Sequence, residues 1–233
     1  MKKLTLAFLI ILFTLTSNVV WSANYTKGLT AYNIGDFTTA LREFKPLAEQ
    51  GDDDAQFWLG LMYDKGNGVP QNYKTAIKWY TLAAEQGHDD SQNDLGLIYA
   101  TGEKHPQDFN IAAKWFKLSA EQDNRRGQNN LGMMYLNGLG VLENYKVAIK
   151  WFKLSAEQGY DYGHYNLSNM YENGYGVLQD NIYAHMWGNI AASQGIKQGG
   201  EIRDRVTKNM TAADISKAQK LANECVAKNY KGC

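Results

Sequence analysis

The sequence predicts an all-α fold, a solenoid of stacked helix pairs, and three observations carry this prediction. The first is a motif, AEQG at 48–51, whose copies start every 36 residues, at 84, 120, 156 and 192. The second is that other positions keep the same step, among them Trp79, Trp115, Trp151 and Trp187. The third is the composition, since three prolines and 22 glycines suit helices joined by glycine-rich turns. Self-similarity at such a period is typical of repeat architectures.

Each repeat is predicted to contain two helices. The first, over 54–64, places its apolar residues at offsets of four, seven and eight, on one helical face: Ala55, Leu59, Met62 and Tyr63. The second spans 73–86. In the intervening KGNGVPQN, 65–72, the glycines end the first helix and Pro70 prevents its continuation. One pair cannot bury its own apolar stripe, whereas stacked pairs can, which predicts a solenoid.

Small residues recur in the middle of each first helix, at Gly60, Gly96, Gly132 and Ser168. Glycine costs a helix about 1 kcal/mol relative to alanine. A cost repeated at every period indicates a repeated benefit, and we expect a neighbouring helix to approach closely there.

The N-terminus has the layout of a secretory signal peptide over 1–23. Lys2 and Lys3 precede an apolar run over 4–15, and the small residues Ser22 and Ala23 follow. An uncleaved N-terminal anchor is the alternative, but the run is short for a full span and no second apolar stretch exists. We therefore expect a periplasmic or secreted protein without membrane insertion after cleavage.

The remaining chain divides by the repeat frame. We expect an N-terminal half-repeat cap at 24–51, a C-terminal helical cap at 196–233, and four full repeats at 52–87, 88–123, 124–159 and 160–195. Thr211 and Asp214 have capping-box spacing at the start of the last helix. Cys225 and Cys233 are predicted to form a disulfide in an exported chain, the alternative being two unpaired thiols.

The segments LGLMYDKGNGVPQNY (59–73) and WYTLAAEQG (79–87) resemble the Sel-one-like repeat family, relatives of the tetratricopeptide repeats. The resemblance covers about 26–195. It implies a right-handed α-solenoid that acts as an interaction scaffold, without implying one partner. Three segments depart from the pattern, but because all keep the 36-residue spacing we expect only local changes there: GEKHP at 102–106, DNRR at 123–126 and AHMW at 184–187.

No catalytic, metal or cofactor site is predicted. The four histidines lack metal-ligand spacing and are assigned to surface or capping positions: His88, His105, His164 and His185. No serine lies in a nucleophile-elbow sequence. A cysteine-rich branch of the resembled family has been linked to β-lactam binding and hydrolysis, but the repeats here contain no cysteine. A net charge of zero argues against a nucleic-acid partner.

The predicted partner surface lies on the first helices, on the side away from the core. Two positions per repeat carry the hypothesis of a groove with asparagine donors and acceptors beside apolar pockets: Phe57 and Leu61, Asn93 and Leu97, Asn129 and Met133, Tyr165 and Asn169. The alternative is that superhelical curvature buries these residues between neighbouring repeats. A second apolar row lies on the second helices, either exposed or covered by neighbouring helices: Leu82, Leu118, Leu154 and Ile190.

The sequence therefore favours an exported protein-interaction scaffold, monomeric, that binds a peptide or protein partner and is not an enzyme. The alternatives are a secreted factor that engages a host protein and a β-lactam-binding or β-lactam-hydrolysing enzyme.

Overall fold

The computed structural model describes residues 25–233, and no strand occurs within this range. The predicted signal peptide, 1–23, lies outside the described residues. The chain divides into two compact units, Met1–Ser91 and Gln92–Cys233. The all-α prediction is confirmed.

The described part of the first unit holds a helix over 25–33 followed by α2 (Phe37–Glu49), α3 (Asp53–Lys65) and α4 (Tyr73–Glu85). Its core is apolar and aromatic, with Phe44, Leu59 and Met62 fully buried. The side chain of Asp52 accepts a hydrogen bond from the main-chain N–H of Ala55 and so caps α3.

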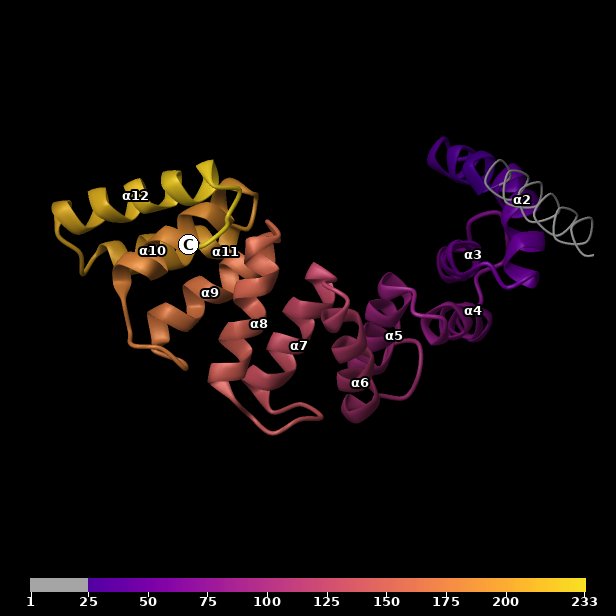
Figure 1. The fold of residues 1–233 in the computed structure, drawn as a ribbon, viewed down its shortest axis with the longest axis horizontal. Coiled ribbons are helices and arrows are strands. Elements are labelled where there is room, and N and C mark those ends of the chain that lie inside the picture. Colours follow the sequence, from indigo (N-terminus) through magenta and orange to yellow (C-terminus); the bar gives the residue numbers. More distant parts are fainter. Residues whose placement is uncertain (1–24) are drawn as a thin grey trace, which may run out of the picture. The chain divides into compact units, whose positions relative to one another are not determined.

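The second unit begins within α5 (Asp89–Thr101) and continues through regular helix pairs (Figure 1). The helices that follow are α6 (Phe109–Glu121), α7 (Arg125–Asn137), α8 (Tyr145–Glu157), α9 (Asp161–Asn173) and α10 (Asn181–Ser193). Every helix from α2 to α10 has 13 residues. The atypical segments GEKHP and DNRR therefore leave the helix spacing unchanged, as predicted.

Glycines end the first helices in the left-handed conformation that the turn requires. Gly66 and Gly138 have φ values of 74° and 63°, and their N–H groups donate to Met62 O and Met134 O. The next glycine of the loop packs against the preceding helix pair, because a Cβ on Gly140 would collide with the carbonyl of Phe109.

The mid-helix glycines bring an aromatic ring of the second helix onto the first helix. A Cβ on Gly96 would lie 2.5 Å from Phe116 Cδ1, and one on Gly132 would lie 2.6 Å from Phe152 Cε1. In the fourth repeat Ser168 occupies this position, and its Oγ donates to the carbonyl of Ala184 at 2.7 Å. The predicted close approach is confirmed, and its partner is a buried aromatic side chain.

After the repeats, α11 (Lys197–Thr207) and α12 (Ala212–Ala227) pack against α10, as Figure 1 shows. The reciprocal Thr211–Asp214 capping box forms at the start of α12. The guanidinium of Arg205 donates two hydrogen bonds to the carboxylate of Glu172, at 2.6 and 2.7 Å, and joins α11 to α9. Cys225 and Cys233 are joined by a disulfide, which folds the C-terminal tail back onto α12.

Candidate partner-binding surface and C-terminal pocket

A ladder of glutamine side chains, which was not predicted from the sequence, connects successive helices. In the first three repeats the glutamine that follows the second helix donates its Nε2–H to a glutamine Oε1 of the first helix. The pairs are Gln86 with Gln56 at 2.8 Å, Gln122 with Gln92 at 2.8 Å, and Gln158 with Gln128 at 2.9 Å. The first-helix glutamine also reaches back one repeat, since Gln56 Nε2 donates to Ala48 O at 3.1 Å. The pairing with the first-helix glutamine explains the glutamine of the AEQG motif. The 36-residue recurrence of Gln56, Gln92 and Gln128 could have revealed it.

His164 takes the place of the first-helix glutamine in the fourth repeat. Its Nε2 lies 3.0 Å from Ala156 O and its Nδ1 lies 2.6 Å from Gln194 Oε1, so both ring nitrogens have partners. Burial lowers the pKa of His164 below its ordinary value, against the opposing effect of its hydrogen bonds to Gln194 and Ala156. The ring stacks on Trp187 at 5.5 Å and lies 4.7 Å from the ring of Tyr230. His164 is therefore a buried link between repeats and the C-terminal tail, and the surface or capping position predicted for it is wrong.

His88 has a capping role, one of the two roles (surface or capping) predicted for the histidines. Its Nδ1 accepts a hydrogen bond from the main-chain N–H of Ser91 at 3.1 Å, at the start of α5. Its Nε2 lies 3.3 Å from Asp54 Oδ1. Burial lowers the pKa of His88, but the hydrogen bond and the charge of Asp54 outweigh burial, so the pKa is raised overall.

Two of the three asparagines of the predicted groove are used inside the scaffold. Asn93 is fully buried and accepts from Asn130 Nδ2 at 2.9 Å, and Asn129 is buried and accepts from Asn166 Nδ2 at 2.7 Å. These pairs join the first helices of successive repeats. Asn93 and Asn129 are thus inaccessible to a partner, because the neighbouring repeat covers this side of the helix.

The other residues of the predicted groove differ in their surroundings. Phe57 is half-buried and stacks on the His88 ring at 4.7 Å. Tyr165 packs on the cluster that contains Ile202 and Val206 of α11. Three further side chains are half-buried, namely Leu61, Met133 and Asn169.

Leu97 differs from the rest of this set because it is 40% exposed. It lies on α5, four residues after the buried Asn93. It is therefore the most accessible apolar member of the predicted groove.

The second-helix row is exposed at one end and covered at the other. Leu82 and Leu118 are 36% and 45% exposed, Leu154 is half-buried, and Ile190 is buried in the cluster that includes Ala222 and Cys225 of α12. The alternative interpretation expected a neighbouring helix to cover this row. That helix is α12, and it covers only the residue of the last repeat, Ile190.

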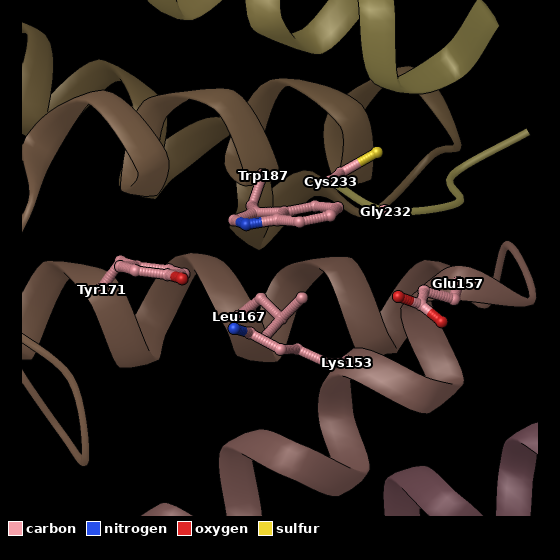
Figure 2. A pocket seen from close by; sticks show the side chains of 7 residues that line it. All are labelled: Lys153, Glu157, Leu167, Tyr171, Trp187, Gly232 and Cys233. Atoms are coloured by element: carbon pink, nitrogen blue, oxygen red, sulfur yellow. The ribbon is translucent and has the colours of Figure 1, made fainter. Parts of the chain in front are cut away.

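A pocket lies where the C-terminal tail meets the last repeats (Figure 2). Its volume is about 160 Å³, and its walls come from α8, α9, α10 and the tail: Lys153, Glu157, Leu167, Tyr171, Trp187, Gly232 and Cys233. Within residues 25–233 no group of three or more acidic, histidine or cysteine side chains could hold a metal ion. In the same range no helix has both the length and the apolar character to cross a membrane.

The helix pairs of equal length, joined by glycine turns and a periodic glutamine ladder, define an α-helical repeat protein. The Sel1 repeat model matches four consecutive segments, 53–88, 89–124, 125–160 and 161–196. The chain therefore belongs to the Sel1 repeat family. Each matched segment starts one residue after the corresponding predicted repeat.

Solved structures of bacterial Sel1-type proteins are similar to this chain. One is a protective antigen of uropathogenic Escherichia coli that displays an SLR fold, with 30% identity and a TM-score of 0.78. The match covers 92% of this chain, which spans 50% of that protein's length. A Sel1 repeat protein from Oxalobacter formigenes has 27% identity, 84% coverage of both chains and a TM-score of 0.70. No curated protein matches the chain.

Proposed function

We propose that this protein is an exported, monomeric interaction scaffold that binds a peptide or protein partner through the first helices of its repeats and does not act as an enzyme. The observation that carries this proposal is a contrast. Amide side chains between repeats have hydrogen-bond partners within the scaffold, whereas the apolar side chain of Leu97 is exposed. The glutamine and asparagine side chains between repeats bond to one another, so they are committed to the scaffold. Leu97, which lies one turn further along α5 than the buried Asn93, is 40% exposed and is available for a partner.

The proposed contact surface is centred on Leu97 and includes Met133 and Asn169, which lie at the equivalent positions of α7 and α9. These residues combine apolar contact with one amide group. An extended peptide offers both apolar side chains and main-chain hydrogen-bonding groups, so it fits such a surface.

Two features support export. The N-terminal sequence has a basic start, an apolar run and small residues at the expected cleavage position. The Cys225–Cys233 disulfide is consistent with an oxidising compartment such as the periplasm or the medium.

Site-specific photo-crosslinking in the producing bacterium tests the proposal. A photoreactive residue at Leu97 should capture a discrete partner, and one at Lys114, which is exposed on α6 of the same repeat, should not. Capture of the same species with equal yield from both positions would contradict the proposed surface.

A second candidate function is a secreted factor that engages a host protein. It is favoured by the similarity to a protective antigen of uropathogenic Escherichia coli. Detection of the mature chain in culture medium without cell lysis would support this destination, and full retention in the periplasmic fraction would exclude it.

A further inference from the structure

Trp187, which lines the pocket between α8, α9, α10 and the C-terminal tail, carries a buried polar group with no protein partner. Trp187 is 3% exposed, and its indole N–H has no acceptor within residues 25–233. An indole nitrogen can only donate. A buried donor left without an acceptor is costly and calls for a specific explanation, such as a ligand.

This tryptophan differs from its equivalents in the other repeats. Trp79, Trp115 and Trp151 are half-buried, whereas Trp187 is buried against His164, and the disulfide-linked tail forms part of the same pocket. The pocket is therefore a feature of the last repeat, created where the repeat pattern ends.

A second donor, the ammonium group of Lys153, lines the same pocket. In the preceding repeat the equivalent pair, Lys117 and Glu121, forms an ion pair at 3.8 Å. Lys153 and Glu157 have the same spacing on α8, but no such ion pair joins them within the described part of the chain. Figure 2 shows the Lys153 ammonium pointing away from the Glu157 carboxylate, toward the part of the pocket that holds Tyr171 and the indole nitrogen.

The polar groups at this end of the pocket are suited to an acceptor. Lys153 and Trp187 can only donate, and the phenol of Tyr171 can donate as well. The Glu157 carboxylate lies at the opposite end of the pocket, away from the Lys153 ammonium group (Figure 2). A ligand carboxylate accepts several hydrogen bonds, and its charge complements the ammonium group.

We propose that this pocket binds a carboxylate group, held by Lys153 and Trp187 with Tyr171 as a third donor. A volume of about 160 Å³ admits a carboxylate with a few attached carbons and no larger body. The carboxylate can come from the C-terminus of a peptide or from a free small acid. In the first case the pocket would anchor the end of a partner on the proposed scaffold, and only this source rests on the proposed function.

The test is an NMR titration of the full mature chain that follows the indole N–H resonance of Trp187, assigned by its loss in Trp187→Phe. This variant keeps the aromatic packing and removes a donor that has no protein acceptor, so it should fold. The probes are N-acetyl-alanine, the peptide acetyl-Ala-Ala-Ala with a free carboxylate, and the amide of each. We expect both the acids, or the peptide acid alone, to shift the Trp187 resonance in a saturable way, and the amides to have no effect.

The two supporting outcomes distinguish the sources. Saturation by both acids with equal affinity identifies a small-acid site, and saturation by the peptide alone identifies a chain terminus. Lys153→Met should weaken acid binding about tenfold or more, as expected for a hydrogen bond to a charged group, and the matched control Lys117→Met should leave it unchanged. Equal shifts with acids and amides, no saturable shift, or equal effects of the two lysine variants would overturn the proposal. Crosslinking from Leu97 is independent of these results and would still test the scaffold function.

Discussion

Replacing Gly132 by alanine tests directly how the repeats pack. The new Cβ would lie 2.6 Å from Cε1 of Phe152, whose side chain is fully buried, so the ring cannot move into solvent. Overpacking of this kind costs about 1–3 kcal/mol. The same substitution gains about 1 kcal/mol of helix propensity, so a control that has the gain without the collision is required.

Gly200→Ala is that control. Gly200 is also buried within a helix, α11, but a Cβ there would lie 3.5 Å from Ala192 Cβ, an ordinary van der Waals contact. We expect Gly132→Ala to be less stable than Gly200→Ala by about 1–3 kcal/mol, measured by urea unfolding followed by circular dichroism. In the Phe152→Leu background the cost of Gly132→Ala should fall, because the ring edge is gone. Equal stabilities of the two alanine variants, or an unchanged cost in the leucine background, would refute the packing account.

Three further predictions concern the last repeat. First, His164→Gln restores the ladder residue of the other repeats. Because the pKa of His164 is lowered in the folded protein, the unfolded chain takes up the proton first as pH falls, and stability is lost below about pH 6.5. In pH-dependent urea unfolding, the glutamine variant should lose less stability than the unmodified protein between pH 7 and 5. Part of the loss should remain, because the pKa of His185 is also lowered. An unchanged pH profile would count against the ladder role of His164. Second, Cys233→Ser removes a crosslink across a sequence separation of eight residues, worth about 2.5 kcal/mol by loop entropy. Hydrogen exchange should therefore accelerate in the last turn of α12 and not in α7, and uniform acceleration would contradict a local role. Third, Glu172→Gln should lower stability in urea unfolding by no more than about 1 kcal/mol, because Arg205 is exposed, and a larger loss would mean that this pair holds the cap in place.

The fold could be predicted from the sequence because the same pattern of residues recurs every 36 positions. The helix bounds, the glycine turns and the close approach at Gly96 and Gly132 all depend on local pattern and on contacts between adjacent helices. In the sequence the AEQG motif marks the repeat period, and in the structure its glutamine also has a physical role in the ladder.

The partner surface was harder to predict, since it depends on how far each helix is rotated toward its neighbour. Asn93 and Asn129 were placed on an open face by helical geometry alone, but the next repeat covers them. The pocket beside Trp187 could not be predicted, because it depends on the tail folding back to place Cys233 beside α8 and α10.

The most direct test of the central claim is the affinity of the crosslinked partner for two matched variants. Leu97→Asp and Leu118→Asp introduce the same charge at similarly exposed leucines on the two helices of one repeat. If partners bind the first-helix surface, Leu97→Asp should raise the dissociation constant about tenfold or more, and Leu118→Asp should leave it unchanged. Unchanged affinity of a folded Leu97→Asp variant, or a loss confined to Leu118→Asp, would contradict the claim and move the binding surface to the second helices.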